Sequence, residues 1–340
     1  MLSHAILASL RQAWPPFVLV AGLLLIGAAA AADGLFEALG ARLARTGLGS
    51  RGLLAALLTL VAVVTAVLNL DTSVVFLTPV LIHAARSRAL DERPFLYGSV
   101  FMANSASLLL PGSNLTNMLV LHTDPENGLA FAGRMLPAWI TACTITALFL
   151  ALAYPLEQSS RGHGELPSHR LGLGATATVA AAVLVVALRN AAIPVFALGL
   201  AVTALRRHRP RVEPRALALL FTLTVTLGTI ARLWQGPAGL LDGSGAWTVA
   251  FVGAAASLLI NNLPATIVLS SHATAHPEAL LLGLDLGPNL VVTGSLAAIL
   301  WLQAARTIDA RPSLATYSRL GLLLVPATML VALAALLAIP

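Results

Sequence analysis

The sequence predicts an all-α polytopic membrane protein with two inverted-topology repeats, each containing a re-entrant hairpin and an interrupted helix. Of the 340 residues, 58% are hydrophobic and 10% are charged, so one aqueous core cannot bury the apolar surface. The apolar residues form runs of about twenty, as membrane-spanning helices do, without the roughly ten-residue alternation of a membrane barrel. Two short polar strings, residues 69–73 and 261–266, interrupt these runs at matching places in the two halves.

The apolar runs define the predicted elements in order. They lie at residues 14–32, 52–86, 95–121, 131–154, 171–188, 191–205, 216–234, 247–276, 278–303 and 316–338. The runs 52–86 and 247–276 are too long for one span and polar in their middles, so each predicts a hairpin whose tip stops inside the membrane. The first run has no clear small-residue cleavage site and is expected to be a retained helix. The total is about eight full spans plus two hairpins.

The basic residues, all of them arginine, predict the orientation of the helices. Cytoplasmic loops of membrane proteins are rich in basic residues. Arginines flank both ends of the first hairpin, whereas the loop 122–130 carries Asp124 and Glu126 and no arginine. We therefore expect the first hairpin to enter from the cytoplasm and the second from outside. Because the arginines follow the loops, the net charge of +6 does not indicate a nucleic-acid partner.

On this map the order of span, hairpin, interrupted span and span occurs twice. The first repeat covers residues 1–154, and the second covers residues 216–340 upside down. Residues 155–215 form a linker with two spans and an arginine-rich cytoplasmic loop. The alternative is a chance similarity among apolar runs of low complexity. Inverted duplication is a common plan of secondary transporters.

The polar strings predict a solute or ion site formed by both repeats. A helix break inside the membrane exposes backbone groups that lipid cannot satisfy, so such a break persists only around a polar cavity. Helix N-termini there favour anions, and free carbonyl, amide and hydroxyl oxygens hold cations. In the first repeat, the expected binding residues are Asn69, Asp71, Thr72 and Ser73, facing Ser113, Asn114, Thr116 and Asn117. In the second, they are Asn261, Asn262 and Thr266, facing Gly294 and Ser295.

Two carboxylates, Asp71 and Asp285, lie inside apolar segments. An ionised carboxylate is costly to bury, so each needs a hydrogen-bonding partner or a bound proton, and both are candidates for proton coupling. The alternatives are a helix cap for Asp71 and a buried structural hydrogen bond for Asp285. Two buried aspartates would also suit an intramembrane aspartyl protease, but the Gly-x-Gly-Asp pattern is absent around Asp285. Asn104 occupies roughly the position in the first repeat that Asp285 holds in the second.

Other candidate ligands are few. His272 and His276 have the i, i+4 spacing of a zinc site with Glu278 nearby, but no fourth ligand is evident. The single cysteine, Cys143, excludes a disulfide within the chain. We expect neither a metal nor a cofactor.

Three stretches of the second repeat carry a family resemblance: Asn-Asn-Leu-Pro-Ala-Thr at 261–266, Gly-Leu-Asp-Leu-Gly-Pro at 283–288, and Gly-Ser-Leu-Ala-Ala-Ile-Leu-Trp-Leu at 294–302. Leu-Thr-Pro at 77–79 and Ser-Asn-Leu-Thr-Asn at 113–117 are their counterparts in the first repeat. With these motifs the chain resembles the arsenite/antimonite efflux permeases of the ion transporter superfamily, which also includes divalent anion:sodium symporters and sodium/proton antiporters. The resemblance implies hairpins that enter from opposite sides, and export of trivalent arsenic or antimony hydroxide against proton entry.

The chain departs from that family at several positions. Leu70 separates the first asparagine from its aspartate, Asn104 stands where the family has an acidic residue, and Asn289 stands where it has a lysine. The chain is also shorter, and two helices expected before the first repeat are absent from it. These differences bear on the substrate more than on the fold.

Together these observations predict a secondary active transporter of the bacterial cytoplasmic membrane rather than an enzyme. The expected solute is arsenite or antimonite, exchanged for protons. The alternative is a sodium- or proton-coupled carboxylate permease, or a sodium/proton antiporter, of the same superfamily. The expected partners are membrane lipid, a small inorganic or organic solute, and H⁺ or Na⁺. A homodimer and a cytosolic ATPase subunit are both compatible with the sequence.

Overall fold

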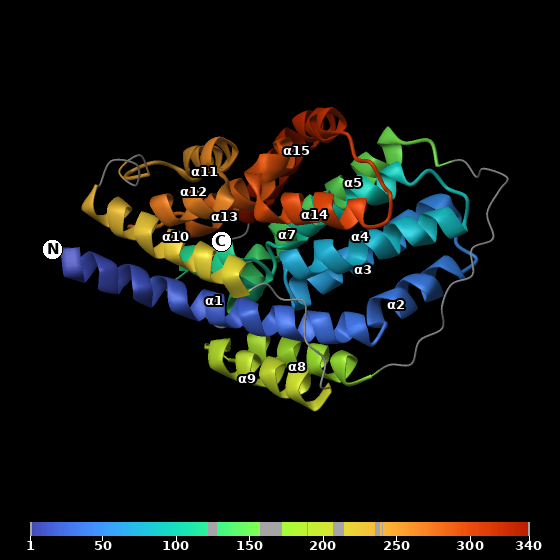
Figure 1. The fold of residues 1–340 in the computed structure, drawn as a ribbon. Helices are drawn as coiled ribbons and strands as arrows, with labels where there is room; N and C mark the ends of the chain where they lie inside the picture. Colours follow the sequence, from blue (N-terminus) through green and yellow to red (C-terminus); the bar gives the residue numbers. More distant parts are fainter. Residues whose placement is uncertain are drawn as a thin grey trace.

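The computed structural model describes residues 2–121, 128–156, 172–188, 190–206, 214–234, 239 and 241–338, and every regular element that these residues form is a helix (Figure 1). The all-α prediction is therefore confirmed. The helices are α1 Leu2–Ala32, α2 Leu35–Ala44, α3 Ser50–Val67, α4 Leu70–Ser87, α5 Arg93–Ala106, η1 Pro111–Ser113, α6 Leu115–Val120, α7 Gly128–Ala153, α8 Leu173–Ala187, α9 Ala192–Arg206, α10 Pro214–Leu233, α11 Ala246–Ile260, α12 Asn262–Leu269, α13 Pro277–Leu286, η4 Gly287–Leu290, η5 Val292–Gly294, α14 Leu296–Arg306 and α15 Leu314–Leu337.

An asparagine separates the two helices in each predicted hairpin. Asn69 lies between α3 and α4, and its side-chain oxygen accepts a hydrogen bond of 2.6 Å from the backbone N–H of Thr72. Asn261 lies between α11 and α12 with φ of 76°, and its oxygen accepts from the N–H of Leu263 at 3.2 Å. Asparagine is a strong helix N-cap and tolerates positive φ better than most residues. The same residue type thus ends one helix and begins the next.

The two interrupted spans break where the α-helical hydrogen bonding cannot continue. Pro111 opens η1 between α5 and α6, and Pro288 lies in η4 between α13 and α14. Proline has no N–H to donate to the preceding turn. Both breaks lie inside the ranges 95–121 and 278–303 that the sequence predicts as broken spans. The inverted relation of the two repeats stays a prediction.

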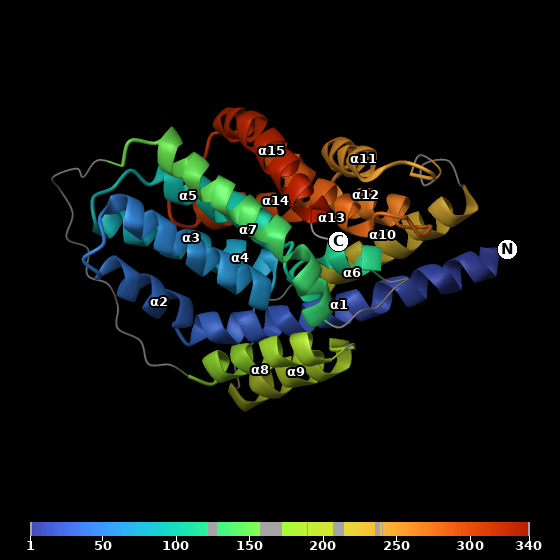
Figure 2. The ribbon, with the colours of Figure 1, turned by 180° about the vertical axis from the view of Figure 1, so that it is seen from behind.

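The two halves of the chain interlock instead of forming separate lobes. Helix α4 of the first half packs along α14 of the second, and α12 of the second half packs against α6 of the first. Helices α7 and α15 pack against each other across the middle (Figure 2). Each hairpin is therefore adjacent to the interrupted span of the other half.

Helix α1 runs along one side of the molecule, with α8 and α9 on its outer face and α10 beside it (Figure 1). An ion pair joins Asp33, just after α1, to Arg206 at the end of α9, and Asp33 also accepts the N–H of Gly174 at 2.6 Å. Helix α1 begins twelve residues before the predicted start at residue 14, and α2 is not predicted at all. The polar residues Arg11 and Gln12 interrupt the apolar run at that point, so the sequence did not predict the first turns of α1.

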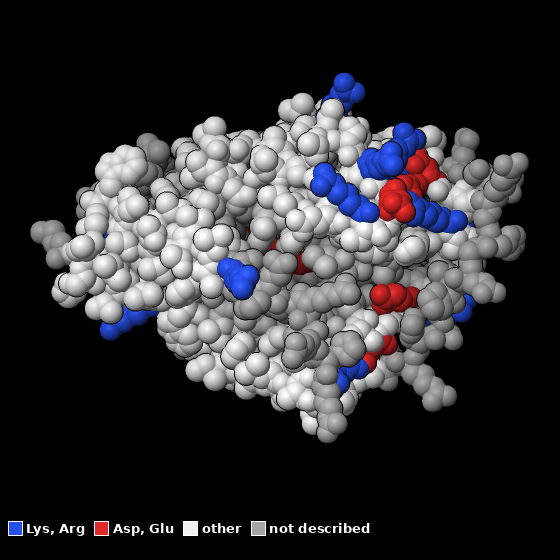
Figure 3. Space-filling model, viewed as in Figure 1, with Lys and Arg blue, Asp and Glu red and all other residues white. Residues whose placement is uncertain are grey.

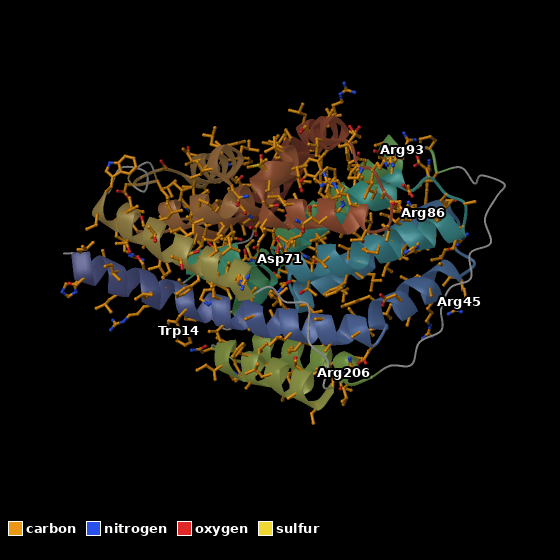
Figure 4. The ribbon with its side chains drawn as sticks, viewed as in Figure 1. Trp14, Arg45, Asp71, Arg86, Arg93 and Arg206 are labelled. Carbon is orange, nitrogen blue, oxygen red and sulfur yellow. The ribbon has the colours of Figure 1, made fainter. Side chains whose placement is uncertain are left out.

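The surface fits a multi-pass membrane protein. Among the described residues, α1, α3, α7 and α15 are long and apolar enough to cross a membrane, and large apolar side chains such as Leu152 and Leu259 are about four-fifths exposed. Helices α8 and α9 have 15 residues each, about 22 Å, and are shorter than a bilayer core of about 30 Å. On the face seen in Figure 3, most charged side chains gather toward the end where Figure 4 labels Arg45, Arg86 and Arg93. The orientation of the helices in the membrane stays a prediction.

Close packing of α11 on α13 gives a test of the fold. A Cβ atom added at Gly283 would meet the backbone oxygen of Ala250 and would lie 2.8 Å from the backbone nitrogen of Ala254. We expect Gly283→Ala to lower the free energy of unfolding by about 1–3 kcal/mol, because neither backbone atom can move easily. Gly133→Ala is the control, since a Cβ there meets nothing within 4 Å. Equal thermal stability of the two purified variants would contradict the packing.

Candidate functional site

Asp285 lies at the centre of the helix breaks, in the last turn of α13, and is fully buried. One oxygen of its carboxylate accepts hydrogen bonds from the Asn114 side-chain amide at 2.9 Å and from the Thr116 hydroxyl at 2.6 Å. The other oxygen lies 3.4 Å from the Ser107 hydroxyl. All three partners belong to the broken span of the first half, so Asp285 joins the two halves.

The Ser107 hydroxyl has two acceptors but only one hydrogen. It donates to the backbone oxygen of Asn104 at 2.8 Å, and it also lies beside the Asp285 carboxylate. If Asp285 is ionised, the hydroxyl must turn away from Asn104 to donate to it. If Asp285 carries a proton, the carboxyl group donates to Ser107, and Ser107 keeps its bond to Asn104. None of the ion pairs between described residues involves Asp285.

Ser113 and Asn117 stabilise the break of the first half. The Ser113 hydroxyl lies 2.5 Å from the backbone oxygens of Ser107 and Leu110. The Asn117 amide donates to the same two oxygens, at 2.7 and 3.0 Å. The Ser107 oxygen cannot be paired by the residue four positions on, because that residue is Pro111 and has no N–H. The Leu110 oxygen also accepts the backbone N–H of Ser113 at 3.1 Å. Both residues therefore have a structural role, and the Asn117 side-chain oxygen remains buried without a partner.

In the second half, the hairpin tip is bonded directly to the break. The Asn261 side-chain amide donates to the backbone oxygen of Thr293 at 2.8 Å. Asn261 thus caps α12 with its oxygen and holds the 3₁₀ segment before α14 with its nitrogen. The corresponding amide nitrogen of Asn69 in the first half is buried and has no partner.

The other predicted residues of the second half lie around this contact. Thr266 donates to the backbone oxygen of Asn262 at 2.7 Å within α12. Ser295 caps α14 by accepting the N–H of Ala298 at 3.1 Å. A Cβ atom at Gly294 would lie 2.9 Å from Cα of Pro288, so the two 3₁₀ segments can pack this closely only with glycine there.

A pair of asparagines links the two breaks next to Asp285. The Asn104 side-chain amide donates to the Asn289 side-chain oxygen at 2.7 Å, and both residues are at most 1% exposed. The free oxygen of Asn104 and the free nitrogen of Asn289 are buried without a partner. These are two of the three positions at which the chain departs from the family it resembles. The sequence did not predict that they touch.

The polar residues at the tip of the first hairpin are not hydrogen-bonded to the first-half break among the described residues. No hydrogen bond within the described residues joins Asn69, Thr72 or Ser73 to residues 113–117, and Asn114 and Thr116 bind Asp285 instead. The Thr72 hydroxyl is buried without a partner, and Ser73 lies 3.4 Å from the backbone oxygen of Val61. Their facing arrangement and their role as ligands stay a prediction.

Asp71 lies in the first turn of α4, near the middle of the molecule (Figure 4). The cap of that helix is Asn69, so the alternative of Asp71 as the cap is wrong. Asp71 is partly exposed, and in the same view Figure 3 shows acidic atoms at the bottom of a hollow at that place. No hydrogen bond joins it to Asp285 in the described part of the chain. The two aspartates therefore do not form the proton-sharing pair that a protease would need.

A cavity of about 530 Å³ lies at the far ends of the site helices. It is lined by Val120 at the end of α6, Leu121 after it, Ser270 and His272 after α12, and Arg134 of α7. Glu278 is ion-paired with Arg134 at 2.8 Å. Within the described residues, no three histidine, cysteine or acidic side chains cluster as a metal site would require.

A sequence profile of citrate transporters matches residues 3–298, most of the chain. The chain belongs to the citrate transporter family. Relatives of this citrate transporter family member include the arsenical pump membrane protein of Escherichia coli K12, which is 26% identical over 350 residues, 89% of this chain and 81% of that protein. The silicon efflux transporter LSI3 of Oryza sativa subsp. japonica is 30% identical over 121 residues. That match covers 36% of this chain and only 25% of the plant protein.

The fold is also similar to a solved structure, the YdaH transporter of Alcanivorax borkumensis. The TM-score is 0.55 at 15% sequence identity, covering 97% of this chain and 86% of that one. The predicted resemblance to the arsenite/antimonite permeases and their superfamily is thus confirmed. Members of the citrate transporter family are membrane transporters and not enzymes, which removes the protease alternative.

Substitutions at Asp285 test the contact between the halves. Asp285→Ala leaves the buried donors of Asn114 and Thr116 without an acceptor, and we expect unfolding to become easier by about 1–3 kcal/mol per donor. Asp285→Asn keeps a side-chain oxygen for both donors, so we expect a smaller loss. Thermal unfolding of the purified variants measures this, with Asp242→Ala on an exposed loop as the control. Equal stability of the two Asp285 variants would show that these bonds contribute little.

Proposed function

We propose that the chain exports a neutral metalloid hydroxide, arsenite or antimonite, across the bacterial cytoplasmic membrane in exchange for protons. The main support for this proposal is Asp285, which is buried and is hydrogen-bonded only by amide and hydroxyl groups of the opposite half. Two relatives, an arsenical pump membrane protein and a silicon efflux transporter, support a metalloid solute.

The unpartnered polar atoms suit a solute that both donates and accepts hydrogen bonds. The amide nitrogen of Asn69 is a donor, the side-chain oxygen of Asn117 is an acceptor, and the Thr72 hydroxyl is both. A hydroxyl group on arsenic or antimony can pair with each of these types. The asparagines that link the breaks, Asn104 and Asn289, are also uncharged. A neutral solute therefore needs no counter-charge from the protein.

Proton binding at Asp285 would couple directly to the position of α6. Asn114 caps α6 and Thr116 lies in its first turn, and both donate to the carboxylate. An ionised carboxylate accepts such bonds strongly, whereas a protonated one accepts them more weakly and becomes a donor itself. Proton uptake therefore loosens the contact between α13 and α6. Asp71, which makes no hydrogen bond or ion pair to another described residue, is the second candidate for a proton carrier.

Transport in everted membrane vesicles tests this function. We expect an imposed pH gradient to drive accumulation of radioactive arsenite, and Asp285→Asn to reduce it at least about tenfold, since an amide cannot carry the proton. Asp71→Asn shows whether the second carboxylate is also required. Asp242→Asn, on an exposed loop, should transport like the unmodified protein. Full gradient-driven accumulation by Asp285→Asn would contradict the assigned role.

Citrate is the second candidate solute, because the matching family profile is that of citrate transporters. A carboxylate would bind to helix N-termini and amide donors without requiring an arginine. The same vesicles, given labelled citrate under a sodium or a proton gradient, separate the two candidates. Accumulation of citrate without accumulation of arsenite would indicate a carboxylate permease instead of a metalloid exporter.

A further inference from the structure

A second buried polar cluster lies away from Asp285, where α1 and α10 meet the ends of α6 and α12. The Arg232 guanidinium donates to the Gln12 side-chain oxygen at 2.7 Å and to the backbone oxygen of Ser271 at 3.0 Å. The Gln12 amide donates to the backbone oxygen of Leu119 at 3.0 Å and lies 3.2 Å from the Ser270 hydroxyl. Gln12 is only 5% exposed. We call Gln12 and Arg232 the Gln12–Arg232 pair.

The pair holds the far ends of the two helices that carry site residues at their near ends. Helix α6 begins after Asn114, which binds Asp285, and ends at the carbonyl group that Gln12 holds. Helix α12 begins after Asn261, the hairpin tip, and ends next to Ser271, which Arg232 holds. A cation near a helix C-terminus interacts favourably with its exposed carbonyls. One pair of side chains thus anchors both short helices to α1 and α10.

An apolar layer lies between the site and the cavity. Leu119 of α6 and Leu263 and Ile267 of α12 form a separate buried cluster, each at most 6% exposed. Along α6, Leu119 follows Thr116 and directly precedes Val120, which lines the cavity. Along α12, Leu263 and Ile267 lie on either side of Thr266 in the sequence and precede Ser270, which also lines the cavity. Helices α6 and α12 pack against each other at this layer.

We propose that Gln12 and Arg232 are positioning residues of the transport cycle: by holding the ends of α6 and α12 together, they keep the apolar layer closed between the site and the cavity. This role in the transport cycle rests on the proposed transport function, but the experiment that tests it needs no solute. Opening of the layer requires these hydrogen bonds to break. Their removal therefore increases the time that the layer spends open.

Cysteine accessibility measures that opening directly. In a Cys143→Ala background, Ile267→Cys reports on the layer, and its rate of reaction with a water-soluble maleimide is measured on the purified protein. We expect Gln12→Leu and Arg232→Met each to raise the rate about tenfold, because each removes bonds to a charged group. The double variant should react no faster than the faster single variant, since both changes disrupt the same hydrogen-bonded pair of side chains. Arg11→Met, an exposed arginine on the preceding position of α1, is the matched control.

Two further variants separate positioning from general loosening. Leu81→Cys, fully buried in the first hairpin, should react at an unchanged slow rate in every background. Arg232→Lys keeps a donor for the Ser271 carbonyl and should retain most of the slow labelling of Ile267→Cys. If Arg232→Met does not fold, Gln12→Leu alone decides. Unchanged labelling in Gln12→Leu, or equal acceleration at Leu81→Cys, would overturn the proposal, whereas failure of arsenite transport alone would leave it standing.

Discussion

The hydrogen bonds from Asn114 and Thr116 to the Asp285 carboxylate are the contact around which the two halves are arranged. A buried carboxylate cannot be left without donors in a low-dielectric surrounding. The donors come from 171 and 169 residues earlier in the chain. The ends of α13 and α6 must therefore meet, and the interlocking of each hairpin with the other half's broken span follows from that meeting.

The cost of breaking helices inside a membrane explains most of the other polar side chains. Ser113 and Asn117 satisfy the carbonyls that the first break frees, and Asn261 does the same at the second. The two halves are not equivalent in this respect. The second hairpin tip uses both ends of its asparagine, whereas the first leaves the Asn69 nitrogen without a partner. An unpartnered donor in a buried position leaves binding capacity for a ligand, so the first hairpin is the better candidate for contact with the solute.

The sequence predicted most of the helices and the positions of their breaks, because both follow from local signals: runs of apolar residues and the short polar strings that interrupt them. It did not predict which polar groups meet. The prediction gave Asp285 no partner in the first half, because a contact between residues 171 positions apart depends on how α13 packs on α6. Gln12 was missed for a different reason. Its neighbour Arg11 is exposed, and together they ended the apolar run on which the helix prediction relied.

The hydrogen bonding of Ser107 depends on whether Asp285 carries a proton. Its single hydrogen satisfies either the Asp285 carboxylate or the backbone oxygen of Asn104, and the side chain of Asn104 in turn holds Asn289 of the second break. Loss of the proton from Asp285 draws the Ser107 hydrogen away and leaves the Asn104 carbonyl without that donor, at the end of α5. Uptake of the proton restores it. A change in the charge of this one carboxylate would therefore alter the hydrogen bonding of α5, α6 and α13 together, and this is the property that the proposed proton coupling needs.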